Sequence, residues 1–534
     1  MNILVCDPIS PKGIALLQQR ADFKVTVLKQ KMAEADLLPL VKEAHALVVR
    51  SETKVTKNVI AAAPNLLVVG RAGVGVDNVD LDAATEAGVL VMNTPGGNAV
   101  SVAEHTLALM LAMARHIPQA SASTRAGKWE KKKLMGNELR GKRLGIIGLG
   151  SIGREVVKRA RAFEMRIVAH DPYVTSKVAH DVGVELVDLD ALYAASDYIT
   201  LHVASTPETQ GMLSHAAFER MKKGVRVVNC ARGELVDEAA LFEAIQSGKV
   251  AGAALDAFSI EPPPAGFPLF GCEAVLATPH IGGSTEEAQE IVGVRIAEQV
   301  MEYLKSGVAI NAVNMPALSP EQYRALSPYA TLAERLGAFA ANVATGNPRR
   351  LRMVYSGKMF GMGTGLLRNA GLAGALSRST SNRANLVNAM QIAEERGWDV
   401  AEHHDKFYGP MDSIRIELET DRGATTVEGV VLLGKQRLMQ VDGIFCEAGL
   451  AGRLIFMKNR DVPGVIGHVG VVLGRNHINI ANFSLGRRDA PSAPGEPLEA
   501  VAVVSTDELV PEGVLAQLRD NPAVMFARAM EFRG

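Results

Sequence analysis

The chain has 534 residues, a formal net charge of −1 and four widely spaced cysteines. This length predicts about three or four domains, and the balanced charge excludes a large electrostatic surface for nucleic acid or a membrane. The cysteines form no C-x-x-C pair, so we expect no disulfide, no metal site and a reducing compartment. The chain opens on an apolar strand and contains no long apolar run. We therefore expect no signal peptide and no membrane span, and a cytoplasmic protein.

Short apolar stretches alternate with helical patterns over residues 1–97, beginning with Asn2–Cys6 and ending with Leu90–Met92. This alternation predicts a parallel, doubly wound sheet. A turn cluster, Asn93–Asn98, closes the segment, and a long apolar helix is expected from about Val102 to Ile117 as a hinge into the next domain. The following basic run, Lys128–Lys133, is most simply a solvated surface.

A nucleotide-binding fingerprint follows. The apolar run Leu144–Ile147 predicts a buried strand, and the glycines Gly148, Gly150 and Gly153 follow it at the start of a helical pattern. The first glycine permits a tight turn, the second admits a pyrophosphate and the third allows close packing of helix on strand. Asp171, at the end of the next strand, suits a ribose 2′-hydroxyl and would repel a 2′-phosphate. The cofactor expected is therefore NAD.

Strands and helices continue to about residue 286, and the helix expected at Glu286–Leu304 leads back to the first segment. Such connectivity places a ligand cleft between two doubly wound domains. Residues 317–450 mix helices and strands without a catalytic constellation, and the tail reads β-α-β-β-α-β, which is a ferredoxin-like order. The predicted fold class is α/β: two Rossmann-like doubly wound domains, an intervening α+β domain and a C-terminal ferredoxin-like domain. The predicted boundaries are residues 1–97 with 287–316 for substrate binding, 98–286 for NAD binding, 317–450 for the intervening domain and 451–534 for the regulatory domain.

Three chemically capable side chains stand at predicted strand ends: Arg232, Glu261 and His280. Oxidation of an alcohol by a nicotinamide needs a base for the hydroxyl proton and a cation for the substrate's anionic end. A carboxylate beside a histidine fixes its tautomer and raises its pKa, and an arginine offers a planar fork to a carboxylate. Cys230 has no activating base in the sequence and is interpreted as a packing residue. Three other histidines are interpreted as structural: His105, His170 and His202.

The motifs Asn229–Glu238, Asp256–Pro262 and Pro279–Thr285, together with Gly148–Gly153, resemble those of the D-isomer-specific 2-hydroxyacid dehydrogenases. The resemblance implies NAD-dependent removal of a hydride from C2 of a D-2-hydroxy acid. It assigns Arg232 to orienting the substrate, Glu261 to supporting the histidine, and His280 to acid–base catalysis. It implies the following cofactor-binding positions: Gly148, Gly150, Ser151, Ile152, Gly153, Asp171, Cys230, Ala231, Asp256, Gly282 and Gly283.

Within the family, Arg71–Asp80 resembles members that act on a phosphorylated 2-hydroxy acid. A phosphate and a carboxylate need separate donors, and the matching substrate-binding positions are Arg50, Ser51, Arg71 and Asn98. The lysines Lys131–Lys133 are further candidates for a phosphate contact, from either subunit of a dimer. Two alternatives stay open: a reductase acting on an unphosphorylated 2-oxo acid such as glyoxylate or hydroxypyruvate, and an NAD-sensing scaffold without turnover.

The tail resembles ACT domains, with Lys458–Val465 matching their ligand-binding loop and His477–Ile480 the start of their second strand. The resemblance implies an amino-acid effector, with L-serine as the candidate, bracketed by Asn459, Asp461 and Asn479. It equally allows an ACT domain that serves only as dimer contact. A homodimer or homotetramer is expected, and the purpose of residues 317–450 and the net direction of the reaction stay open.

Overall fold

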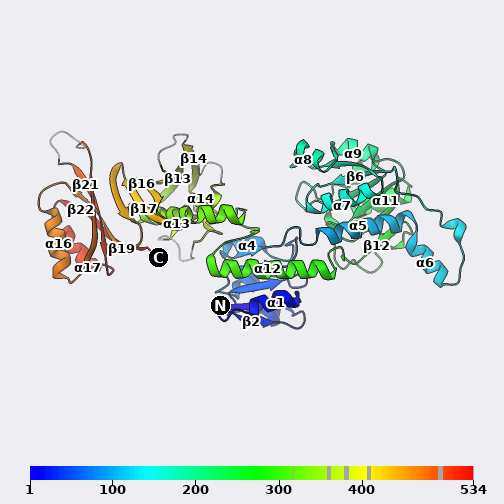
Figure 1. Ribbon diagram of the computed structural model, residues 1–534, viewed down its shortest axis with the longest axis horizontal. Helices are drawn as coiled ribbons and strands as arrows, with labels where there is room; N and C mark the ends of the chain where they lie inside the picture. The colour runs from blue at the N-terminus through cyan, green and yellow to red at the C-terminus, as the bar shows by residue number, and fades with distance from the viewer. Residues whose placement is uncertain (317, 358–362, 378–383, 406–410, 491–496, 533–534) are drawn as a thin grey trace.

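Four β-sheets stand in a row along the long axis of the molecule in a computed structural model (Figure 1). The structure describes residues 1–534 apart from 317, 358–362, 378–383, 406–410, 491–496 and 533–534. The N-terminal sheet lies between the nucleotide-binding sheet on one side and the two C-terminal sheets on the other (Figure 1). Among the helices of the described residues, none combines the length and the apolar character that a membrane crossing needs.

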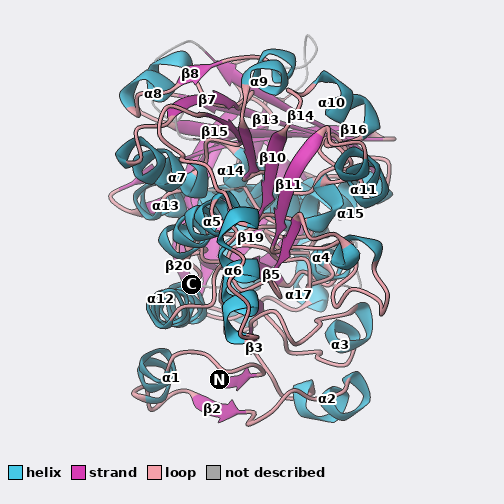
Figure 2. Ribbon diagram, turned by 90° about the vertical axis from the view of Figure 1, so that its right-hand side faces the viewer, coloured by secondary structure: helices cyan, strands magenta, loops and turns pink. Residues whose placement is uncertain are grey.

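The N-terminal sheet has five parallel strands in the order β2-β1-β3-β4-β5. These are β1 (Asn2–Val5), β2 (Lys24–Val27), β3 (Ala46–Val49), β4 (Val68–Arg71) and β5 (Leu90–Met92). Its helices are α1 (Pro11–Gln18), α2 (Glu34–Val41), α3 (Lys57–Ala61), α4 (Leu81–Glu86) and α12 (Glu286–Ser306). Helices α1 and α2 lie on opposite sides of the β2 edge (Figure 2), as expected for a doubly wound sheet. Helix α12 returns from the far domain and packs on α1 and β4.

The nucleotide-binding sheet has seven parallel strands in the order β12-β11-β10-β9-β6-β7-β8. These are β6 (Arg143–Ile147), β7 (Arg166–His170), β8 (Glu185–Leu186), β9 (Tyr198–Leu201), β10 (Val225–Asn229), β11 (Val250–Leu255) and β12 (Val275–Ala277). Its helices are α5 (Ala99–Ala114), α6 (Ile117–Arg125), α7 (Ser151–Ala162), α8 (Ser176–Asp181), α9 (Leu189–Ala195), α10 (His215–Arg220) and α11 (Glu238–Gln246), with short 3₁₀ turns η1 (Lys131–Lys133), η2 (Gly233–Leu235) and η3 (Pro268–Gly271).

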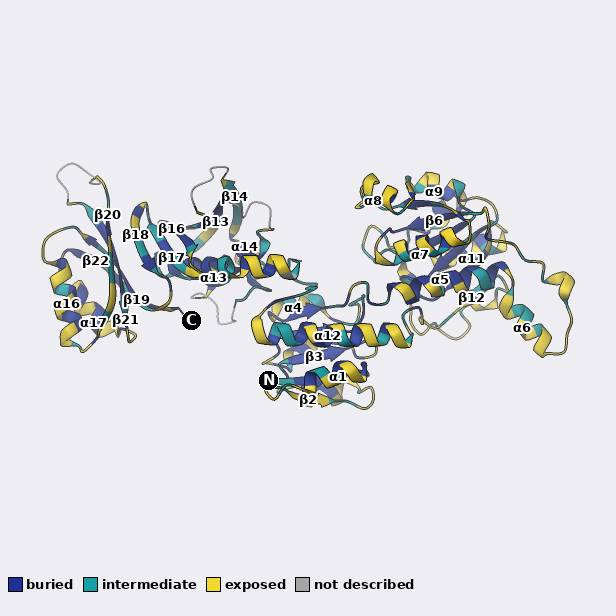
Figure 3. Ribbon diagram, in the orientation of Figure 1, coloured by how far each residue is buried: buried dark blue, intermediate teal, exposed yellow. Residues whose placement is uncertain are grey.

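The apolar hinge helix ends earlier than the sequence pattern predicts. Helix α5 stops at Ala114 because His116 takes a left-handed φ of 52°. A separate helix, α6, then begins at Ile117 with Pro118 in its first turn, and none of its residues is buried. Ile117 stands four residues after Met113 and so continues the helical spacing past the polar Arg115 and His116, and periodicity alone did not reveal the break. Helix α6 projects from the body of the domain with a largely exposed surface (Figure 3).

The third sheet is mixed and has the order β14-β13-β15-β16-β17-β18. Its strands are β13 (Pro348–Ser356), β14 (Asp399–Asp405), β15 (Ser413–Thr420), β16 (Gly423–Leu432), β17 (Lys435–Val441) and β18 (Ile444–Gly449), and its helices are α13 (Pro320–Val343), α14 (Gly365–Leu376) and α15 (Ala389–Glu395). The Gly-rich stretch Gly357–Gly374 contains most of α14, although its residues 358–362 lie outside the described residues. Glycine serves close packing here, because a Cβ on Gly374 would lie 1.9 Å from the Glu334 carbonyl oxygen of α13.

The C-terminal sheet is antiparallel, in the ferredoxin-like order β20-β21-β19-β22. Its elements are β19 (Gly452–Arg460), α16 (Val465–Arg475), β20 (Ile480–Arg487), β21 (Glu499–Thr506), α17 (Glu512–Arg519) and β22 (Val524–Phe532). The predicted β-α-β-β-α-β tail is therefore confirmed. The loop expected at Arg487–Pro497 falls partly outside the described residues.

One buried hydrophobic cluster extends from the first sheet through α12 and α13 into the third and fourth sheets. Phe339 of α13 and Phe456 of β19 meet edge to face in it, with ring centroids 5.1 Å apart and both side chains fully buried. The other face of the C-terminal sheet carries a separate core beneath α16 and α17. The predicted fold class is thus confirmed, and the C-terminal domain is joined to its neighbour by a shared core.

Candidate active site

The sequence-predicted site residues come together where parallel strands of two sheets end. Gly148, Arg232 and His280 follow the carboxyl ends of β6, β10 and β12. Arg71 ends β4 in the N-terminal sheet, and Arg50 follows β3. Carboxyl ends of parallel strands are where ligands of doubly wound folds bind. The Arg232–Asp77 ion pair joins the two sheets at this place.

The β6–α7 turn has the shape that a pyrophosphate needs. Gly148 has φ 97°, and a Cβ there would lie 2.5 Å from the His202 carbonyl oxygen. A Cβ on Gly153 would lie 2.1 Å from the Gly148 carbonyl oxygen, so glycine is required for helix–strand packing. A Cβ on Gly150 would meet no described atom within 4 Å. Gly150 therefore faces open space at the N-terminus of α7, where the helix dipole favours an anion.

Asp171 is held beside this turn by the backbone. Its Oδ2 accepts a hydrogen bond from the Leu149 N–H at 2.8 Å and its Oδ1 accepts one from the Tyr173 N–H at 2.9 Å. A carboxylate has further lone pairs, so it can still accept from a ribose hydroxyl. Ser151 and Ile152 open α7 at the same turn. The residues of this turn fit an NAD dinucleotide.

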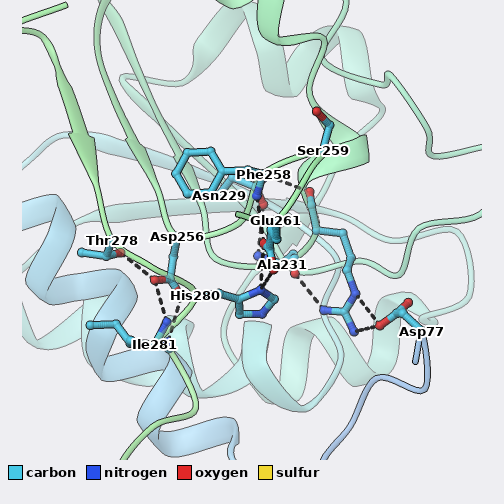
Figure 4. A network of polar contacts seen from close by, with 12 residues as sticks. Asp77, Asn229, Ala231, Asp256, Phe258, Ser259, Glu261, Thr278, His280 and Ile281 are labelled. Carbon is cyan, nitrogen blue, oxygen red and sulfur yellow. Dashed lines mark hydrogen bonds and ion pairs between the residues drawn. The ribbon is translucent and has the colours of Figure 1, made fainter. Parts of the chain in front are cut away.

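Glu261 and His280 face one another (Figure 4), with His280 Nδ1 2.8 Å and 2.9 Å from the two carboxylate oxygens. The hydrogen bond that His280 Nδ1–H donates to Glu261 raises the pKa of His280 above its ordinary value, although burial opposes this. Burial acts to raise the pKa of Glu261, but the bonds from His280 and from the Phe258 N–H outweigh it and lower that pKa. His280 also has a left-handed φ of 53°, a conformation uncommon outside glycine and typical of functional sites.

Asp256 is buried beneath the histidine loop, with only 1% of its surface exposed. Its carboxylate accepts hydrogen bonds from the Thr278 hydroxyl at 2.6 Å and from the N–H groups of Ile281 and Gly282 at 2.9 and 2.8 Å. Burial would raise the pKa of Asp256, but these bonds and one from His105 outweigh it and lower the pKa. Asp256 therefore fixes the backbone that carries His280 and Gly282.

His105, interpreted as structural from the sequence, lies at this site. Its Nε2 is 3.2 Å from the Thr278 hydroxyl and 3.3 Å from Asp256 Oδ1. The sequence showed only that His105 lies on the predicted hinge helix, and this did not indicate a contact with Asp256. His202 is half-buried, and this burial lowers its pKa to about 3, so it stays neutral. Burial raises the pKa of the Cys230 thiol to about 12, which agrees with a packing role for this residue and not a nucleophilic one.

Arg232 reaches across the cleft to the N-terminal domain. Its Nε and Nη2 lie 3.1 and 2.9 Å from the same carboxylate oxygen of Asp77, and its Nη1 donates to the Ala231 carbonyl at 2.8 Å. Figure 4 shows Asp77 entering from an N-terminal segment, opposite the Glu261–His280 pair. Sequence reasoning placed Asp77 within a substrate motif but gave it no role.

The other arginines lie close to Arg232. Burial, Arg232 and Arg50 together lower the pKa of Arg71 to about 10. The Nε of Arg71 is buried and has no hydrogen-bond partner among the described residues, so it can still bind an anion. The amide oxygen of Asn98 is also buried without a partner among the described residues, and it can accept a hydrogen bond from a ligand. The amide nitrogen of Asn98 would lie 2.9 Å from a Cβ on Gly283.

Two residues missed from the sequence hold the Arg50–Ser51 loop. The buried carboxylate of Asp7 accepts from the N–H groups of Arg50 and Thr53 at 2.6 and 3.1 Å. The amide of Asn78 donates to the Arg50 carbonyl at 2.7 Å. The sequence could have indicated Asp7, because it is a charged residue that directly follows a buried strand. Ser51 itself is exposed.

The lysine run stands apart from these arginines. Residues Lys131–Lys133 form the exposed turn η1, and Lys133 Nζ pairs with Glu130 at 2.9 Å. Among the described residues, the ion pairs of the run include this one and none with a residue of the N-terminal sheet. A phosphate contact by these lysines therefore stays a prediction.

A cavity of about 370 Å³ lies in the C-terminal domain at the start of α16. Asn459 and Asp461 line it, together with Arg487, whose Nη1 is 3.2 Å from Asp461 Oδ2. The amide oxygen of Asn459 is buried and has no hydrogen-bond partner among the described residues. Asn479 is not in the lining, and its amide donates to Asp507 at 2.8 Å.

Three family models match separate parts of the chain. The NAD-binding domain of the D-isomer specific 2-hydroxyacid dehydrogenases matches residues 107–282, the D-3-phosphoglycerate dehydrogenase intervening domain matches residues 325–442, and the ACT domain matches residues 453–523. Fold and site thus define a D-isomer-specific 2-hydroxyacid dehydrogenase with two added domains, and NAD is its cofactor.

Relatives narrow this class. The D-3-phosphoglycerate dehydrogenase of Methanocaldococcus jannaschii is 43% identical over 98% of this chain and 98% of its own length. That of Archaeoglobus fulgidus is 43% identical over 99% of this chain and 100% of its own length. A crystal structure of a glyoxylate reductase from Paecilomyes thermophila is 30% identical with a TM-score of 0.54, and covers 59% of this chain and 98% of the reductase. The chain belongs to the D-3-phosphoglycerate dehydrogenase family, which confirms the resemblance seen in its sequence.

Proposed function

We propose that this enzyme oxidises D-3-phosphoglycerate to 3-phosphohydroxypyruvate with NAD, the first step of phosphorylated L-serine biosynthesis. The observation that carries this proposal is the Glu261–His280 pair, which shares a cleft with Arg232, Arg71 and Arg50. A base and a group of cations in one cleft suit an alcohol that also bears a carboxylate and a phosphate. The full-length relatives with this name support the same substrate.

His280 accepts the proton of the C2 hydroxyl at Nε2, because its Nδ1 is engaged by Glu261. The imidazolium formed is stabilised by the Glu261 carboxylate, and the pair holds the ring in one orientation. Arg232 binds the substrate carboxylate and the developing carbonyl oxygen, while Arg71, Arg50, Ser51 and Asn98 hold the phosphate end. NAD, when bound at the β6–α7 turn, supplies the acceptor for the C2 hydride.

The reductase alternative acts on unphosphorylated substrates. It is disfavoured because the buried Arg71 and the neighbouring Arg50 provide more positive charge than a single carboxylate needs. The glyoxylate reductase structure also covers only 59% of this chain, whereas the D-3-phosphoglycerate dehydrogenases cover 98–99% of it. The scaffold alternative is disfavoured by the intact hydrogen bond between Glu261 and His280.

The test is an NADH-absorbance assay with D-3-phosphoglycerate, glycerate and glycolate. We expect D-3-phosphoglycerate to have the highest kcat/KM. His280→Ala should lower turnover by about 10²- to 10⁴-fold, the contribution of general acid–base catalysis, with NADH affinity nearly kept. Glycolate as the best substrate would replace this function with the reductase alternative. Activity of His280→Ala near the wild-type rate would remove His280 from the mechanism.

We further propose that the cavity at the start of α16 binds L-serine. Asp461 suits its ammonium group, Arg487 its carboxylate, and the unpartnered Asn459 oxygen accepts one more hydrogen. Serine should lower the activity of the wild-type enzyme, and Asp461→Asn should weaken its binding about tenfold or more. Calorimetric titration with L-serine, with D-serine as control, measures this. Equal binding by Asp461→Asn would exclude Asp461 as the ammonium partner.

We infer a cytoplasmic homodimer or homotetramer. The four free cysteines support a reducing compartment. The projecting segment from α6 to Met135 supports self-association, because Trp129 and Met135 are 84% and 80% exposed on it. Light scattering of the purified protein measures the state, and Trp129→Ala should shift it toward a smaller species.

A further inference from the structure

Arg232, the proposed carboxylate-binding cation, already holds a carboxylate in this structure. Arg232 contacts Asp77 Oδ2 through both its Nε and its Nη2. These two nitrogens form one of the pairs of donors with which a guanidinium binds an anion. Asp77 belongs to the N-terminal domain and Arg232 to the nucleotide-binding domain, so this pair spans the cleft. The carboxylate of Asp77 is 70% exposed, whereas the Arg232 side chain is 27% exposed.

The loop that carries Asp77 is itself built to receive an anion. A Cβ on Gly75 would lie 1.9 Å from Arg232 Nη2, and one on Gly73 would lie 1.5 Å from Arg71 Nη1. Two guanidinium groups therefore press against the backbone of one short loop. The N–H groups of Val74, Gly75 and Val76 donate no hydrogen bond to any residue that the structure describes. Backbone N–H groups beside two arginines attract a carboxylate.

We propose that Asp77 is an internal stand-in for the substrate carboxylate, which displaces it from Arg232 on binding. The inference rests on the proposed role of Arg232. In the free enzyme Asp77 balances the charge of the arginine group and keeps Arg232 extended into the cleft. On binding, one carboxylate replaces another on the same guanidinium, so Asp77 competes with substrate and promotes release of product.

An exposed ion pair contributes little to stability, so its competition is modest and depends on salt. Asp77→Asn keeps the side-chain shape and removes the competing charge. We expect it to lower KM for D-3-phosphoglycerate, and the dissociation constant of oxalate, by about threefold to tenfold at low salt. The gain should shrink as the salt concentration rises.

The matched control is Asp80→Asn. Asp80 is also exposed and lies three residues from Asp77, and its substitution by asparagine removes the same charge. Unlike Asp77, its carboxylate accepts a hydrogen bond from the Ala83 N–H at the start of α4. Asparagine also caps helices well, so this variant should fold. Asp80→Asn should bind oxalate as the wild type does, apart from a small general charge effect.

The decisive measurement is calorimetric titration of oxalate into the enzyme–NADH complex for all three proteins. Oxalate carries no phosphate, so the result stands even if D-3-phosphoglycerate proves not to be the substrate, which the substrate assay decides separately. Tighter oxalate binding by Asp77→Asn alone supports the proposal. Unchanged binding, weaker binding or an equal gain in both variants overturns it, and weaker binding with lower kcat would make Asp77 a positioning residue for Arg232. NADH binding by each variant verifies its fold.

Discussion

At the scale of single residues, chemistry depends on pairs that are distant in sequence. Glu261 and His280 are 19 residues apart and follow different strands, yet their side chains meet at 2.8 Å. Arg232 and Asp77 are 155 residues apart. In the first pair Glu261 raises the pKa of His280, and His280 lowers the pKa of Glu261, so each group favours the charged form of the other. Such mutual stabilisation is what a histidine needs to hold a proton during turnover.

The raised pKa of His280 predicts a pH profile. Oxidation needs the neutral imidazole, so kcat/KM should rise with pH through a pKa above the ordinary value of 6.5. Glu261→Gln removes the carboxylate that raises this pKa. The acid limb should therefore move to lower pH, while the maximal rate falls by about 10²-fold. Initial rates between pH 5 and pH 9 measure both effects, and an acid limb that stays in place would separate Glu261 from the titration of His280.

At the scale of elements, the β6–α7 turn shows that glycines of one motif serve different ends. Gly153 is needed by the fold itself, because its Cβ would press on the Gly148 carbonyl. Gly150 is not needed for packing, because its Cβ would meet no described atom within 4 Å, so we expect its role to lie in ligand binding. The sequence motif predicted both roles, since a Gly-rich turn before a helix has few geometries. The packing of Gly153 agrees with it, and the pyrophosphate role of Gly150 stays a prediction.

This difference predicts opposite outcomes for two alanine variants. Gly153→Ala should lower the free energy of unfolding by about 1–3 kcal/mol, as overpacking does. Gly150→Ala should leave stability nearly unchanged and weaken NAD binding about tenfold or more, the loss of one hydrogen bond to a charged group. Urea denaturation and NADH fluorescence titration measure the two quantities. Similar stability losses in both variants would contradict the assignment.

At the scale of the whole molecule, the C-terminal sheet is joined to its neighbour by packing. The Phe339–Phe456 contact lies in a core that continues into the third sheet, and Arg528 Nη1 donates to the Asn342 carbonyl across the same junction at 2.8 Å. A ligand in the cavity at α16 binds on the opposite, helix-covered side of this sheet. The two C-terminal sheets are therefore expected to unfold together.

Truncating a side chain in the junction should make the two C-terminal sheets unfold separately. Phe456→Ala removes a fully buried ring and should destabilise the C-terminal half by about 3–5 kcal/mol. Calorimetry should then show a new transition at lower temperature, while NADH binding at the distant β6–α7 turn is kept. Leu433→Ala, at a side chain that is 94% exposed, is the control and should change nothing. A single unshifted transition in Phe456→Ala would show that the junction contributes little.

The sequence by itself determined the classes of structure and chemistry. Period-2 and period-3.6 patterns, glycine turns and strand-end polar residues are local signals, and they predicted both doubly wound sheets, the ferredoxin-like tail, NAD and the Arg232–Glu261–His280 set. The patterns did not place the break between α5 and α6, because Ile117 continues the helical spacing across it.

Only the tertiary structure decided which distant groups meet. It placed Asp77 on Arg232, His105 near Asp256, and Asp7 beneath the Arg50 loop, and it placed Asn479 outside the cavity that contains Asn459 and Asp461. None of these contacts has a local sequence signature, because each depends on how two separate chain segments pack. The domain boundaries and the roles of the site residues stay predictions that the proposed experiments address.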